Sequence, residues 1–137
     1  MPKSELIRQI EAAITGHERW KDDLVAATRS GRPATAGNGS EAGDPAQWLQ
    51  TIACEPGSRD QAAAQEIRHL HREFHRVAGS VKAYLARGMA SAAQFIMDGE
   101  CAALSEMLLE ALCEWRDACL QDQSSASAIS LRVFSTP

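Results

Sequence analysis

The stretch IRHLHREFHRVAGSVKAYL, residues 67–85, decides the fold because its apolar side chains return at steps of four and three residues. This spacing places them along one stripe of an α-helix, which is the pattern of a seam between packed helices. Gly88 follows the last repeat, so we predict a helix over residues 59–87. His75 lies beside the seam, whose members are Ile67, His71, Phe74, Ala78, Val81 and Leu85.

The same spacing predicts a helix on either side of this one, over residues 4–30 and 91–121. A short helix over 44–53 follows a Gly- and Ser-rich loop at about 30–43, with Asp44 as its cap and Pro45 in its first turn. We therefore expect an all-α fold, an antiparallel four-helix bundle with an additional short helix, over residues 1–123. Residues 124–137 are expected to form a flexible tail. Core candidates in the last helix are Phe95, Met97, Leu104, Met107, Leu108, Leu112, Trp115 and Cys119.

The composition excludes several classes of protein. A net charge of −4 without a compact Lys/Arg run argues against nucleic-acid binding. The sequence has no run of about 18 apolar residues, so we expect no membrane insertion. Charges inside the first apolar stretch argue against a signal peptide, which favours a cytoplasmic protein. Its four cysteines show no CxxC spacing and are expected to be thiols.

Three of the four histidines, His17, His71 and His75, fall on inward-facing helix positions. A buried imidazole without a partner is costly, and a shared metal ion would satisfy all three. Zinc suits them because it binds neutral imidazole nitrogens and prefers a tetrahedral ligand set. From the spacing alone, the alternative is a pair of partly exposed histidines on a helix surface.

Three motifs in this order, HERW (17–20), QWL (47–49) and HREFH followed by RVAG (71–79), resemble the chemoreceptor zinc-binding (CZB) domain. The resemblance implies a cytoplasmic, homodimeric four-helix bundle that binds zinc through three histidines and one cysteine. It also implies a sensory or regulatory module of bacterial chemoreceptors and diguanylate cyclases. His17, His71 and His75 match the ligand histidines, and Trp20 and Trp48 match the packing tryptophans of that family.

The cysteine of the family pattern is missing here. It stands five residues before the second tryptophan, where this chain has Gly43. Asp44 is the nearest donor, and a carboxylate is an acceptable zinc ligand, although capping alone also explains an aspartate at this place. Cys54 is a less favoured rival, and water is a third possibility. We expect one zinc ion per chain, bound by His17, Asp44, His71 and His75.

The expected function is therefore a non-catalytic zinc sensor in bacterial signalling, without the thiolate that a redox switch needs. It would act as a homodimer or on an output protein such as a chemoreceptor or a cyclase. The start MPKSE favours a free-standing domain over a fragment. Two alternatives remain, a helical interaction or dimerisation module with a structural metal, and a hydrolytic enzyme with water on a three-histidine zinc site and Glu66 or Glu73 as base.

Overall fold

The computed structural model describes residues 2–31, 45–54 and 59–135, and in these ranges the chain is helical with short turns and no strand. The all-α prediction is therefore confirmed. None of the helices in the described ranges is long and apolar enough to cross a membrane. The elements in chain order are α1 (Lys3–Ser30), α2 (Pro45–Ala53), α3 (Arg59–Ala86), α4 (Ala90–Ile96), the π-helix η1 (Met97–Cys101) and α5 (Ala102–Ser135).

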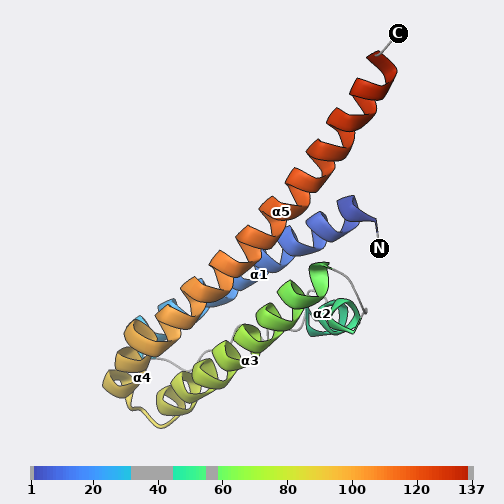
Figure 1. The fold of residues 1–137 in the computed structure, drawn as a ribbon. Helices are drawn as coiled ribbons and strands as arrows, with labels where there is room; N and C mark the ends of the chain where they lie inside the picture. Colours follow the sequence, from blue (N-terminus) through green and yellow to red (C-terminus); the bar gives the residue numbers. More distant parts are fainter. Residues whose placement is uncertain (1, 32–44, 55–58, 136–137) are drawn as a thin grey trace.

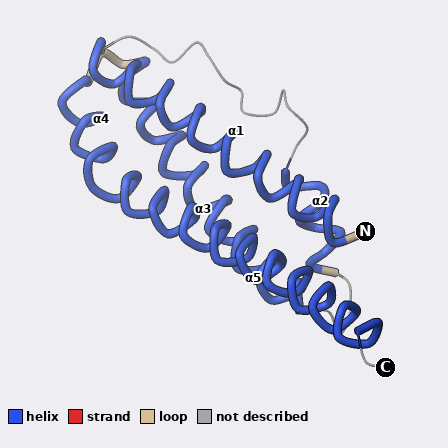
Figure 2. The backbone as a smooth tube through the Cα atoms, turned by 90° about the horizontal axis from the view of Figure 1, so that it is seen from above, coloured by secondary structure: helices blue, strands red, loops and turns tan. Residues whose placement is uncertain are grey.

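Three long rods make up the body of the molecule (Figure 1). The first two are α1 and α3, which run in the same direction. The third consists of α4, η1 and α5, which follow one another without a break and return antiparallel to both (Figures 1 and 2). The short α2 packs mainly on α3, while α1 packs mainly on α5.

Glycines end two of the rods where the sequence places them. Gly31 follows α1 with φ 67°, and its N–H donates to the carbonyl oxygens of the last turn. Gly88 follows α3 with φ 74°, and the next N–H, that of Met89, donates to the Tyr84 carbonyl at 2.8 Å. A left-handed residue closed by such bonds is the usual C-terminal stop, so the predicted ends of both helices are confirmed.

Most of the predicted seam on α3 is buried. Phe74, Ala78 and Val81 have no exposed surface, and Ile67 and Leu85 are nearly as buried. The core they join has two parts. One lies toward the N-terminus of α1 and includes α2, and the other lies around Trp20, Phe74 and η1.

The last rod differs from the prediction in two ways. Its helix continues to Ser135, beyond the end that we predicted near Gln121. Phe95 is 82% exposed and Met107 is 52% exposed, so both core assignments are wrong. In contrast, Met97, Leu108, Leu112, Trp115 and Cys119 are buried as predicted. The buried side of the rod shifts at the π-helix η1, because a π-helix has a wider turn than an α-helix and so changes which residues face the core.

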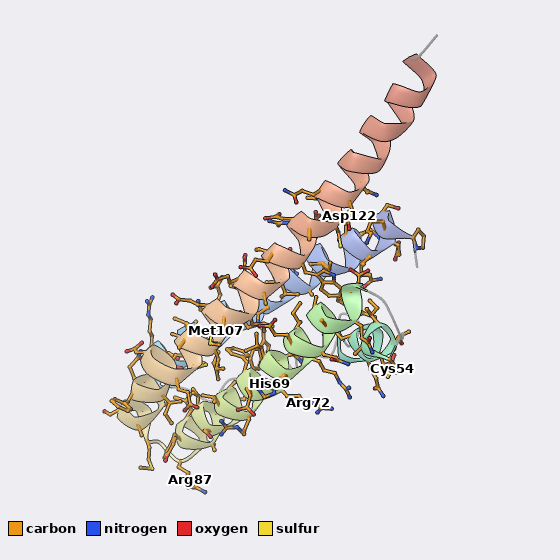
Figure 3. All side chains as sticks on the ribbon, in the orientation of Figure 1. Cys54, His69, Arg72, Arg87, Met107 and Asp122 are labelled. Carbon is orange, nitrogen blue, oxygen red and sulfur yellow. The ribbon has the colours of Figure 1, made fainter. Side chains whose placement is uncertain are left out.

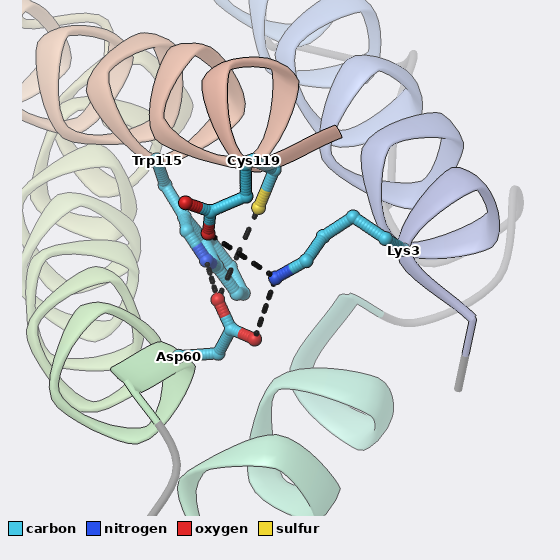
Figure 4. A network of polar contacts seen from close by, with 5 residues as sticks. Lys3, Asp60, Trp115 and Cys119 are labelled. Atoms are coloured by element: carbon cyan, nitrogen blue, oxygen red, sulfur yellow. Dashed lines mark hydrogen bonds and ion pairs between the residues drawn. The ribbon is translucent and has the colours of Figure 1, made fainter. Parts of the chain in front are cut away.

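A polar network joins the three rods near the start of α1 (Figure 4). The Asp60 carboxylate accepts a hydrogen bond from Trp115 Nε1 at 2.8 Å and lies 3.5 Å from Lys3 Nζ. Lys3 Nζ also lies 3.7 Å from Asp122 on α5. The Cys119 thiol points at the same carboxylate, at 3.9 Å. Asp60 therefore links α3 to both α1 and α5.

We expect Asp60→Ala to lower the free energy of unfolding by about 2 kcal/mol, because a hydrogen bond to a charged group contributes about 1.5–3 kcal/mol. Urea unfolding followed by circular dichroism measures this loss. Asp117→Ala is the matched control, since the Asp117 side chain is 64% exposed and pairs with its neighbour Arg116. Equal effects of the two substitutions would contradict a linking role for Asp60.

Candidate metal centre

The two histidines of HREFH form a pair on α3. His71 is half-buried, whereas His75 is exposed, so the prediction that His75 faces inward is wrong because its position lies at the edge of the buried stripe. Their Nε2 atoms lie 3.0 Å apart. Their ring centres lie 4.3 Å apart with the rings edge to face. The helix explains the contact, because residues four apart stand one turn above each other on the same face.

This pair has the geometry of a metal chelate. Two nitrogens bound to one tetrahedral zinc at about 2.0–2.1 Å stand about 3.3 Å apart, close to the distance between these two atoms. In the pair as it stands, one ring donates an N–H to the lone pair of the other. If the donating ring instead carried its proton on Nδ1, both Nε2 atoms would offer a lone pair to a shared ion, and His75 is exposed to solvent.

His17 approaches the pair from α1. Its ring packs edge-on against Phe74, with ring centres 4.5 Å apart, and Phe74 lies between the paired histidines in sequence. His17 is only 9% exposed, and its Nε2 lies 2.8 Å from Ser105 Oγ on α5. His17 is therefore next to the pair but is bonded to a different helix.

The surroundings of His17 hold its imidazole neutral. Burial is the largest cause, and together with the charges of His71, Lys21 and His75 it lowers the pKa of His17 to about 4. A neutral imidazole keeps a lone pair, which is the form that binds a metal ion.

Trp20 forms one wall of the site. Its ring centre lies 4.8 Å from that of His75 and 5.2 Å from that of Phe74. Lys82 Nζ lies 4.9 Å above the Trp20 ring, in a cation–π contact. Trp20, from the HERW motif, is thus at the histidines, whereas Trp48, from the QWL motif, stacks on Trp115 at 5.7 Å in the other part of the core.

The structure brings together part of the predicted ligand set. His71 and His75 meet, and His17 lies nearby, but no three His, Cys, Asp or Glu side chains of the described ranges converge as metal ligands do. Asp44 lies outside the described residues, so its role as the fourth ligand stays a prediction.

Cys54, the rival fourth ligand, lies away from the histidine pair. It is exposed at the end of α2, as Figure 3 shows, and that end is held to the start of α3. The amides of Gln61 and Gln65 both donate to the Ala53 carbonyl. These glutamines precede His71 by about two or three helical turns, so the end of α2 that carries Cys54 is held at a part of α3 well before the histidine pair. His69 also lies on α3, and its side chain is exposed (Figure 3).

Ser105 was not among the predicted site residues. It has no exposed surface and sits on the buried face of α5 between Cys101 and Leu108. The sequence contained a signal for its burial. Ser105 comes four residues after Cys101 and three before Leu108, so it is a polar side chain on the apolar stripe of the helix. Nothing in the sequence indicates that its partner is a histidine 88 positions earlier.

Comparison of the chain with protein-family models, curated proteins and solved structures gives no match.

Proposed function

We propose that this protein is a zinc-binding regulatory module of the kind that the CZB resemblance implies, without catalytic activity. The observation that carries the proposal is the His71–His75 pair, whose Nε2 atoms are spaced almost as a tetrahedral ion requires. The buried, neutral His17 next to the pair supports a third nitrogen ligand. Asp44 is our candidate for the fourth.

The geometry suggests how a bound ion would act on the fold. Zinc would supply a shared acceptor for the imidazole lone pairs. His71 and His75 would hold it on α3, and His17 would join it from α1. The backbone of α1 lies closer to α5 than to α3, and large side chains such as Trp20 and Phe74 fill the space between α1 and α3. The three histidines would add a metal link across this side-chain contact, so that metal occupancy would act as a two-state input to the packing of the two rods.

The proposal also includes the finer features that the resemblance implies. These are an antiparallel four-helix bundle with an additional short helix, a homodimer in the cytoplasm, and a signalling partner such as a chemoreceptor or a cyclase.

The central test is the zinc content of protein purified without a histidine tag. We expect about one zinc per chain, and we expect His71→Ala to lower zinc affinity at least about 100-fold, because a lost ligand costs more than a lost second-shell contact. His69→Ala is the matched control, since His69 is an exposed histidine on the same helix. Competition with a chromophoric chelator measures the affinities.

Asp44→Ala in the same assay tests the fourth ligand. A weaker but still stoichiometric site would support Asp44, and unchanged affinity would make it a helix cap only. If wild-type protein binds no zinc even after zinc is added, or if His69→Ala and His71→Ala behave alike, the metal proposal is wrong.

A second candidate function is a helical interaction module, and a groove between α3 and α5 favours it. The groove has a volume of about 230 Å³. Its apolar lining includes Ile67 and Trp115, and its acidic side chains are Asp60, Glu66, Glu114 and Asp122. Such a groove suits a basic amphipathic helix of a partner protein. If the protein showed no zinc affinity, this second function would be favoured over the first.

An enzymatic role has less support. His17 and Ser105 are spaced as a base and a nucleophile would be. However, Ser105 has no exposed surface, so a substrate could not reach its hydroxyl in this arrangement.

A further inference from the structure

We propose that Ser105 is a positioning residue for His17. It would fix the orientation and tautomer of the imidazole, so that His17 offers Nδ1, and not Nε2, to the metal ion. This inference rests on the proposed metal function. It adds a residue from α5 to a site whose ligands come from other helices.

The contact is short and fully enclosed. His17 Nε2 and Ser105 Oγ lie 2.8 Å apart, with the serine completely buried and the histidine 9% exposed. Among the described residues only one other polar side chain, Thr28, is buried to this degree. A buried polar atom that lost such a partner would destabilise the fold, so this bond holds the ring in place.

The chemistry of imidazole then selects the ligand atom. A neutral ring carries one N–H and one lone pair, on different nitrogens. When Nε2–H donates to Ser105, the lone pair is on Nδ1, across the ring from that bond. With the opposite tautomer, Nδ1 would carry the proton and could not bind a metal ion. A serine in a helix can accept this bond because its own O–H can turn to the carbonyl of the preceding turn.

The arrangement corresponds to a common feature of metal sites. A ligating histidine usually donates its second ring N–H to a neighbouring oxygen, and loss of that neighbour typically lowers metal affinity 10–100-fold. We therefore expect Ser105→Ala to weaken zinc binding about 10–100-fold.

The matched control is Thr28→Val, which removes the other buried hydroxyl. Thr28 is 3% exposed and donates to the Leu24 carbonyl within α1, without contact to a histidine. Both variants should be less stable, but only Ser105→Ala should change zinc affinity. This comparison separates positioning from a general loss of stability.

The direct readout is ¹⁵N NMR of the histidine rings, which reports the tautomer without zinc and the coordinating nitrogen with zinc. We expect His17 in the metal-free protein to carry its proton on Nε2 and to bind zinc through Nδ1. Ser105→Ala should lose the preference for this tautomer. The wild-type spectrum keeps the test decisive even if the variant folds poorly.

The outcomes separate this inference from the function on which it rests. If wild-type protein binds zinc through Nε2 of His17, or if Ser105→Ala binds zinc as tightly as wild type, the positioning role is wrong and the zinc site stands. If wild-type protein binds no zinc, both are wrong.

Discussion

Phe74→Ala is expected to lower the free energy of unfolding by about 3–5 kcal/mol, the usual cost of removing a buried aromatic ring. Phe74 has no exposed surface and packs edge-on against both His17 and Trp20, with ring centres 4.5 and 5.2 Å away. The total free energy of unfolding of a natural domain of this size is only about 5–15 kcal/mol. The melting temperature should therefore fall by about 10–15 °C, as measured by circular dichroism with a chelator present.

Phe95→Ala is the matched control for this prediction. The same atoms are removed from a side chain that is 82% exposed, so the change in stability should stay within about 0.5 kcal/mol. A large loss for Phe95→Ala would mean that this ring is buried in solution, for instance against another chain. A small loss for Phe74→Ala would contradict the core described above.

Acid should destabilise the metal-free protein through His17. Its pKa is about 4 in the folded protein and near 6.5 in an unfolded chain, so the unfolded state binds more protons between these values. The stabilisation is complete above pH 6.5 and is lost as the pH falls toward 4. The free energy of unfolding should fall by about 2 kcal/mol between pH 7.5 and pH 5. The full loss, reached below pH 4, should be about 3 kcal/mol.

A His17→Gln variant isolates this effect, because glutamine is neutral at both pH values. With a chelator present, wild-type protein should lose about 2 kcal/mol more than His17→Gln in urea unfolding at pH 5 compared with pH 7.5. His69→Gln is the control and should follow wild type, since His69 is exposed. Parallel pH profiles for wild type and His17→Gln would show that His17 is not buried in its neutral form.

The helices could be predicted from sequence where the heptad pattern is uniform. On α3, Phe74 and Val81 lie on one face because seven residues make nearly two turns. In the last rod, the buried face runs through Ala93, Met97, Cys101 and Ser105, at three steps of four. In a regular α-helix each such step turns the face by about 40°, and the wide turn of η1 absorbs this rotation. A prediction that assumed a regular α-helix throughout therefore placed Phe95 in the core, whereas its side chain is exposed.

The candidate site could be predicted only where its residues share an element. His71 and His75 are four apart on one helix, so their contact follows from helical geometry alone. The bond between His17 and Ser105 depends on how α1 and α5 dock, and no local spacing contains that information. The predicted role of Asp44 depends in the same way on how the start of α2 lies relative to α3.

The pairing of α1 with the last rod has a consequence for the order in which the chain folds. Contacts between α3 and the rod that follows it span a short turn, so this hairpin closes at a low entropic cost. The contacts of α1 bridge much longer separations, 88 positions in the case of His17 and Ser105. During synthesis α1 leaves the ribosome first but meets its main partner last. We therefore expect the C-terminal hairpin to nucleate folding and α1 to complete the core.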